Sequence, residues 1–356
     1  MPKFQCLIII TLVSAISTSA ISQPIQSEVL TGLRYSHADW ELACSNTRQC
    51  QLAGYQADEG ENGVTVLLTR RAGANQPISA QLQLAQMNEV TNKSGLPASF
   101  ALNFKINQRP LGKIKLAQAS LSGQLSAEQT RALVTALAGK AQIVFEHGQQ
   151  SWRLSDQGAA AVLLKADEFQ GRLGTSEAWI KKGSKPESAV LPALPKPIIQ
   201  RAKLPKAQAQ DASFAQRNYR DLLAALRQSV KHDDCPALAP DAETKPELSS
   251  LRLSETQFLI SSLCWRAAYN EGEGYWVVNA TKPFKASLVT PNATEFNDGL
   301  LLSSQKGRGI GDCWSSQEWV WNGRNFLLSS SSFSGMCKQI APGGAWQLMT
   351  YETELK

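Results

Sequence analysis

The sequence has few of the residues and none of the short motifs that mark common enzyme classes. Only three of its 356 residues are histidine, which leaves little material for a multi-histidine metal site. It contains no G-x-S-x-G, H-E-x-x-H, P-loop or G-x-G-x-x-G motif. Hydrolysis by a pair of carboxylates needs only two acidic side chains and stays open. The sequence therefore predicts no catalytic residue, no metal ligand and no cofactor.

Beyond its first 22 residues the chain lacks any apolar run long enough to cross a bilayer. The apolar run LIIITLVSAI, residues 7–16, follows Lys3 and precedes small residues, with cleavage expected near Ala20 or Ser22. A run of this length matches the apolar core of a signal peptide and is too short for a membrane span. We therefore predict a signal peptide over residues 1–22 and a periplasmic or secreted mature protein without a transmembrane segment.

Removal of that segment takes away Cys6 and leaves an even number of cysteines. The six are Cys44, Cys50, Cys235, Cys264, Cys313 and Cys337. An even count in an exported chain predicts disulfides, although six cysteines allow fifteen pairings. Pairing of neighbours is the most economical scheme, and it joins Cys44 to Cys50, Cys235 to Cys264, and Cys313 to Cys337. Zinc is the alternative, but the chain has no C-x-x-C pair.

Net positive charge is confined to one segment. Residues 181–206 hold five of the sixteen prolines and seven basic residues against one glutamate. Without Lys3 and this segment, 28 basic residues face 29 acidic ones, so the folded parts carry no basic surface that would indicate nucleic-acid binding. Dense proline favours extended backbone, and we predict a linker over residues 184–212. A solvated spacer is the favoured interpretation, and weak contact with an anionic surface is the alternative.

Before the linker, residues 28–183 show the patterns of an antiparallel sheet with short helices. Period-two alternation of apolar and polar residues occurs at residues 64–69, 78–84 and 100–106. Ser126 and Gln129 have the spacing of a capping box, which predicts a helix that ends at Gly139. Ser155 is expected to cap a second helix over residues 159–169.

After the linker, residues 213–356 begin with helical spacing over 213–231 and continue as a β-rich, tryptophan-rich region. Six of the nine tryptophans lie here. Asn322-Gly323 between two apolar runs predicts a hairpin. With a two-residue loop, Trp319 would pair with Phe326. The fold class is α+β with strands dominant: an N-terminal antiparallel-sheet domain, a linker, a helix and a mostly-β domain.

The tryptophans of this second region allow two interpretations. Trp314, Trp319 and Trp321 could form an exposed binding surface, for example for a sugar. Burial in the core is the commoner fate of aromatic residues that alternate along a strand.

Several short motifs resemble one family of secreted proteobacterial proteins. They are DWELACSNTRQC (39–50), AGY (53–55), RRAG (70–73), DEFQGR (167–172), GIGDC (309–313), WVWNG (319–323) and GGAW (343–346). Together they resemble the family called domain of unknown function 1176. The resemblance implies disulfide roles for Cys44, Cys50, Cys313 and Cys337, and it brings no activity, cofactor or catalytic residue. The N-terminal half is also distantly similar to the invasion-associated locus B family, which suggests a role at the cell envelope.

We therefore interpret the chain as an exported, disulfide-bonded envelope protein that binds a partner protein or polymer. The alternative is a periplasmic hydrolase or carbohydrate-binding protein that uses acidic and tryptophan residues.

Overall fold

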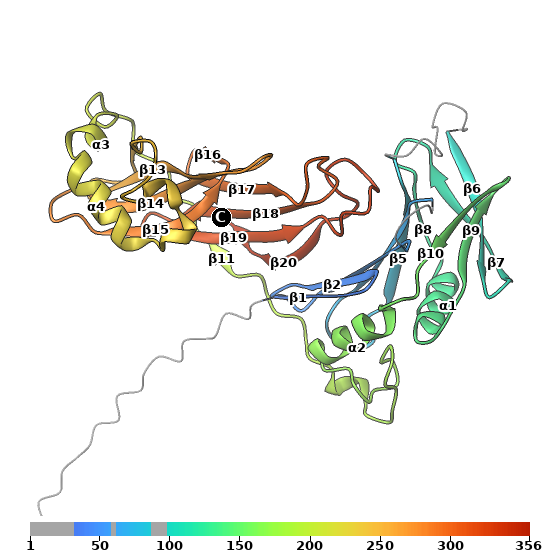
Figure 1. The fold of residues 1–356 in the computed structure, drawn as a ribbon. Coiled ribbons are helices and arrows are strands. Elements are labelled where there is room, and N and C mark those ends of the chain that lie inside the picture. The colour runs from blue at the N-terminus through green and yellow to red at the C-terminus, as the bar shows by residue number, and fades with distance from the viewer. Residues whose placement is uncertain (1–31, 58–61, 87–97) are drawn as a thin grey trace, which may run out of the picture.

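The computed structural model describes residues 32–57, 62–86 and 98–356 (Figure 1). The predicted signal peptide lies outside these residues. None of the helices in the described part of the chain has the length and apolarity needed to span a membrane.

The N-terminal half is one ten-stranded sheet in which all neighbours are antiparallel. In sheet order its strands are β1 (Leu33–His37), β2 (Trp40–Cys44), β3 (Cys50–Tyr55), β4 (Val64–Arg70), β5 (Ile78–Leu84), β8 (Ser122–Gln124), β7 (Arg109–Ala117), β6 (Ser99–Ile106), β9 (Ile143–His147) and β10 (Gln150–Leu154). The strands predicted from alternation correspond to β4, β5 and β6. β6 buries alternate positions, as expected for a sheet with one buried face. β4 is instead buried on both faces, because Val64, Val66 and Leu68 face one core and Leu67 faces another.

The sheet bends so that its two ends share one hydrophobic core. Trp40, Leu68, Phe104 and Phe145 belong to the same buried cluster although they come from both ends of the strand order. The N–H of Ser155, just after β10, donates to the carbonyl of Tyr55 on β3 at 3.0 Å. The N-terminal half is therefore closed around its core.

Two helices complete this core, α1 (Ala127–Leu137) and α2 (Ala159–Phe169). The predicted capping box of Ser126 and Gln129 is confirmed at the start of α1. The prediction that Ser155 caps α2 is wrong, because its hydroxyl accepts from Gln157 and the cap is Gly158. Gly158 has a φ of +90°, and a Cβ atom there would lie 1.8 Å from a carbonyl oxygen. Only glycine fits this position.

The C-terminal half consists of two packed antiparallel sheets. The four-stranded sheet contains β12 (Ser249–Arg252), β13 (Gln257–Arg266), β14 (Glu271–Asn279) and β15 (Ala286–Ala293). The five-stranded sheet contains β16 (Glu295–Asn297), β17 (Leu300–Lys306), β18 (Trp314–Trp321), β19 (Phe326–Phe333) and β20 (Leu348–Glu352). A cluster that includes Leu259, Val277, Leu301 and Trp321 fills the space between them. This half is a β-sandwich.

Helices cover the outer face of the four-stranded sheet (Figure 1). They are α3 (Phe214–Arg217) and α4 (Tyr219–Ser229), with short 3-10 turns at η4 (His232–Asp234) and η5 (Pro236–Leu238). The single helix predicted over residues 213–231 is interrupted at Asn218, whose side chain donates to the carbonyl of Phe214 at 3.0 Å. Such local side-chain bonds compete with helical geometry.

The hairpin at Asn322-Gly323 forms, but its predicted register is wrong. Trp321 pairs with Phe326, and Trp319 pairs with Leu328. The loop has four residues because the Asn322 side-chain oxygen accepts from the N–H groups two and three residues later, at 2.9 and 2.8 Å. This is the ordinary way in which asparagine stabilises a turn.

The proline-rich segment is extended and is bound along its length. It contains η3 (Glu187–Ala189) and β11 (Ile198–Ile199), and β11 pairs in parallel with β21 (Glu354–Leu355). The N–H of Leu194 donates to the carbonyl of Thr47 in the N-terminal half at 3.2 Å. The side chain of Lys196 forms an ion pair with Glu352 at 2.6 Å. The segment therefore contacts both halves of the molecule.

A seam joins the two halves directly. Ala53, Tyr55 and Leu67 on the N-terminal sheet pack against Phe333 and Ile340 of the C-terminal half. Figure 1 shows the loops between the C-terminal strands extending toward the N-terminal sheet. We refer to this contact as the seam.

The seam also has a buried polar centre. The hydroxyl of Tyr55 donates to the carboxylate of Glu41 at 2.7 Å and accepts from the N–H of Met336 at 3.1 Å. Gly335 has a φ of +102°, and a Cβ atom there would lie 2.2 Å from the Tyr55 hydroxyl. Burial raises the pKa of Glu41, although the hydrogen bond from Tyr55 acts in the opposite direction.

The three disulfides are Cys44–Cys50, Cys235–Cys264 and Cys313–Cys337. These are the pairs expected from the spacing of the cysteines along the chain. Each bridge lies within one half of the molecule, so none of these three disulfides joins the two halves.

Candidate functional site

The three tryptophans considered as a binding surface do not lie on one face. Trp314, at the start of β18, is partly exposed. Trp319 and Trp321 occupy alternate positions on the opposite face of the strand, where both contact the core between the sheets. Trp321 is 1% exposed. The three tryptophans therefore do not form one binding surface, because Trp319 and Trp321 face the core and Trp314 lies on the opposite face.

Trp314 lines a cavity of about 480 Å³ at one end of the β-sandwich. The cavity lies between the turn that joins β13 to β14 and the ends of β15, β17 and β18. Its lining is Glu247, Leu263, Arg266, Tyr269, Asn270, Glu271, Glu273, Ala293, Thr294, Ser304, Gln305, Lys306 and Trp314. We call it the Trp314 cleft. Its volume is within the range of small-molecule sites in proteins.

A second cavity, of about 380 Å³, shares Ser304 and Trp314 with the first. Its other lining residues are Ser316, Ser332, Phe333, Ser334, Gly343, Trp346 and Gln347. Because the two cavities share part of a wall, they adjoin along β17 and β18. We call this one the serine cavity.

Hydrogen bonds between elements hold the walls of the Trp314 cleft together. Asn270, in the β13–β14 turn, donates to the carbonyl of Lys306 at 2.9 Å and accepts from its N–H at 3.0 Å. Gln305 donates to the carbonyls of Glu271 and Asn292 at 2.9 and 3.1 Å. These bonds connect the two sheets across the end of the sandwich, so the cleft is formed before any ligand arrives.

The loop between β17 and β18 is fixed by a buried carboxylate and a disulfide. Asp312 accepts from the Arg308 side chain at 2.7 Å and from the N–H of Gln339 at 2.7 Å. Burial alone would raise the pKa of Asp312, but these hydrogen bonds outweigh it and hold the pKa below its usual value. Cys313–Cys337 then connects the loop to the segment after β19.

In the described part of the chain, one group of side chains could in principle hold a metal ion. It consists of Asp312, Cys313 and Cys337, whose potential ligand atoms lie within 4.8 Å of one another. Both sulfurs are used by the disulfide, and the carboxylate is bound by Arg308. Metal binding to cysteine needs thiolates. This group therefore acts as a structural support for the cleft.

Hydrogen bonds hold the two tryptophan rings of the cavities in defined positions. The indole N–H of Trp314 donates to the carbonyl of Gly311 at 2.9 Å, and that of Trp346 donates to Thr65 at 2.9 Å. Tyr269 is 47% exposed at the tip of its turn. Rings with few remaining rotamers lose little entropy when a ligand packs on them.

The chain matches, over residues 34–353, the family described as "Protein of unknown function (DUF1176)". The chain belongs to this family. A relative is the "Uncharacterized protein YpfG" of Escherichia coli (strain K12), which is 27% identical over 330 residues, covering 87% of this chain and 90% of the relative. No solved structure matches.

The resemblance to the DUF1176 family is thereby confirmed. The similarity of the N-terminal half to the invasion-associated locus B family stays a prediction.

Two motifs that carried the resemblance to DUF1176 meet beside Trp314. The GIGDC motif supplies the loop before Trp314, and the GGAW motif supplies Gly343 and Trp346 of the serine cavity. The two motifs are joined directly, because the N–H of Gly343 donates to the carbonyl of Gly311 at 2.8 Å. The sequence contained both motifs but did not indicate that they meet in the fold.

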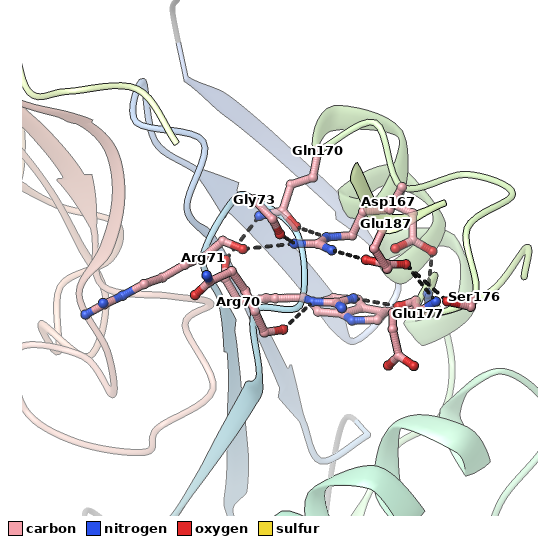
Figure 2. Close-up of polar contacts among 11 residues, drawn as sticks. Arg70, Arg71, Gly73, Asp167, Gln170, Ser176, Glu177 and Glu187 are labelled. Carbon is pink, nitrogen blue, oxygen red and sulfur yellow. Dashed lines mark hydrogen bonds and ion pairs between the residues drawn. The ribbon is translucent and has the colours of Figure 1, made fainter. Parts of the chain in front are cut away.

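The RRAG (70–73) and DEFQGR (167–172) motifs build a buried polar network in the N-terminal half (Figure 2). Arg172 is fully buried and donates to the side chain of Gln170 at 2.7 Å and to the carbonyls of Arg71 and Gly73 at 3.1 and 2.8 Å. Burial and the neighbouring Arg70 lower the pKa of Arg172 to about 10, so it is charged at neutral pH. We call this group the Arg172 network.

Asp167 closes the network on the side of α2. Its carboxylate accepts from the N–H groups of Trp179 and Ile180 at 2.7 and 3.0 Å. Burial raises its pKa, with these hydrogen bonds acting against the rise. The group is buried and its donors are used by the protein itself, so it stabilises the segment after α2.

Of the residues that line the Trp314 cleft, the sequence had indicated only Trp314. Tyr269 is the other aromatic residue of the cleft. It stands in a turn, outside any motif or alternating pattern. Only the folded arrangement brings it to the same cavity as Trp314.

Proposed function

We propose that this member of the DUF1176 family is an exported protein of the cell envelope that binds a ligand in the Trp314 cleft. The observation that carries the proposal is the preformed cavity with fixed aromatic residues and polar groups at the end of the β-sandwich. Three disulfides support an oxidising compartment outside the cytoplasm.

Binding is favoured over hydrolysis by the state of the cleft glutamates. Glu271 forms an ion pair with Arg266 at 2.9 Å, and Glu273 accepts from the hydroxyl of Tyr275 at 2.9 Å. Acid–base chemistry requires carboxylates that are free to exchange protons with a substrate. Two of the three glutamates in the cleft are instead engaged with the protein.

Photo-crosslinking in cells tests this proposal without knowledge of the ligand. A benzophenone amino acid, which inserts into C–H bonds, would replace Tyr269 in the cleft. The matched control position is Arg131, which is exposed on α1 in the other half. We expect adducts from position 269 that disappear with Trp314→Ala, and none from position 131. Equal labelling at both positions, or no adduct at position 269, would contradict the proposal.

A further inference from the structure

The shape of the site indicates an elongated ligand. The Trp314 cleft and the serine cavity adjoin at Ser304 and Trp314, and together they offer two compartments of about 480 and 380 Å³. Aromatic residues occur in both compartments and between them, at Tyr269, Trp314 and Trp346. A chain of repeated ring-shaped units would place successive units on such residues.

The lining indicates a ligand that is rich in hydroxyl groups and carries little charge. The serine cavity contains no charged side chain among its lining residues, and its polar groups are serine hydroxyls and the amide of Gln347. In the Trp314 cleft three acidic residues face two basic ones. Hydroxyls and amides exchange hydrogen bonds with neutral polar groups, whereas nucleic acids require a surplus of basic groups.

One corner of the Trp314 cleft is apolar as well as aromatic. Leu263 is 38% exposed in the wall of the cleft. Its cross-strand partner is Glu273, whose carboxylate is a hydrogen-bond acceptor. An acetamido group presents a methyl group and an N–H donor on the same substituent. The methyl group would cover Leu263 while the N–H donates to a carboxylate, which matches both features of the corner.

We infer that the Trp314 cleft and the serine cavity together bind an extended glycan of N-acetylated amino sugars. The inference rests on the proposed function, because it names the ligand of that same cleft. Sugar rings pack on the aromatic residues, and their hydroxyls bond to the serines and to Gln347.

Isothermal titration of the full exported chain with the hexamer of β-1,4-linked N-acetylglucosamine tests this inference. Cellohexaose, which has the same linkage and ring size without acetamido groups, is the matched control ligand. We expect the N-acetylated hexamer to bind at least about tenfold more tightly than cellohexaose. A tenfold difference corresponds to about 1.4 kcal/mol.

Variants of residues that line the cleft test whether the glycan binds there. Trp314→Ala should weaken the affinity by about tenfold or more and Tyr269→Ala by about fivefold, as expected for aromatic residues at the centre and side of a binding site. Leu327→Ala removes a similarly exposed apolar residue (39%) that lines neither cavity, and it should leave the affinity unchanged. Because Tyr269 is an exposed turn residue, its substitution tests the site even if Trp314→Ala fails to fold.

Absence of binding to the hexamer would overturn the inference, as would equal binding of cellohexaose or affinity that neither cleft variant changes. These outcomes are separate from failure of the proposed function. If position 269 still gives a Trp314-dependent adduct in cells, for example with a protein, the cleft binds a ligand that is not this glycan. If no adduct forms, the proposed function itself fails.

Discussion

In the N-terminal half several buried charged side chains bond only to the protein itself, whereas in the C-terminal half the buried Asp312 holds a loop beside an open cavity. In the first, Arg172, Asp167 and Glu41 are almost fully enclosed and bonded to the protein itself. In the second, Tyr269 and Trp314 remain accessible at the end of a sandwich whose centre is filled. Family-like motifs occur in both halves. A motif can therefore stabilise the fold in one region and support the proposed binding site in another.

The largest effect is expected from the Arg172 network. Arg172→Met should lower the free energy of unfolding by about 4 kcal/mol, because it leaves buried carbonyls and Gln170 without their donor. Hydrogen exchange measured by mass spectrometry would locate the loss in the N-terminal half. Lys165→Met, which removes an exposed ion pair with Glu168, is the control and should cost about 0.5 kcal/mol or less. Equal effects would refute the structural role of the network.

Removal of either of two disulfides that close loops of similar length distinguishes an effect on stability from an effect on binding. Cys313–Cys337 and Cys235–Cys264 close segments of 24 and 29 residues, and replacement of either pair by serine should cost about 3 kcal/mol. Only Cys313–Cys337 supports the loop beside Trp314. Titration with the N-acetylated hexamer should therefore show weakened binding in the Cys313→Ser, Cys337→Ser variant alone. Equal weakening in both variants would show that the loop does not position the cleft.

The sequence predicted several local features and the cysteine pairs correctly, but not the cleft. The capping box of Ser126 and the strands β4, β5 and β6 depend on near neighbours and were found, whereas the cap of α2 at Ser155 was wrong. The register of the 322–325 hairpin depends on how one asparagine side chain bonds in its turn. The cleft depends on contacts such as Asn270 with Lys306, 36 residues apart, which no local pattern encodes.

The division into two domains joined by a linker stays a proposal, and Gly335 offers a way to test it. Gly335→Ala forces a side chain against Tyr55 at a positive φ and should weaken the seam by about 2 kcal/mol. Trypsin should cut first in or just before the linker, at the exposed residues Lys181, Lys182, Arg201, Lys203 or Lys206, without reductant. We expect the wild-type fragments to co-elute in gel filtration and the Gly335→Ala fragments to separate.

Gly139→Ala is the control for that experiment, because a Cβ atom there meets nothing within 4 Å. Its fragments should behave as in the wild type. Wild-type fragments that separate at once would show that the seam contributes little to the association of the halves.

The smallest effect concerns Glu41 and is dependent on pH. Burial raises its pKa above the ordinary 4.5, so the folded chain holds this proton more tightly than the unfolded chain. The folded state therefore loses stability as pH rises from about 4.5 through the raised pKa. Glu41→Gln removes that loss and should be more stable than the wild type at pH 8, with no difference at pH 4.

Urea denaturation at the two pH values measures this difference, with the exposed Glu255→Gln as control. A Glu41→Gln variant that is less stable than the wild type at pH 8 would show that the ionised Glu41 stabilises the seam.

One measurement tests most directly whether the ligand binds in the C-terminal cleft and not in the N-terminal half. Fluorine NMR of the chain labelled with 5-fluorotryptophan observes its nine tryptophans separately once each is assigned by substitution. On titration with the N-acetylated hexamer, the resonances of Trp314 and Trp346 should shift while those of the buried Trp40, Trp152 and Trp321 stay in place. Shifts confined to Trp40 and Trp152, or an unchanged Trp314 resonance at saturation, would contradict the account.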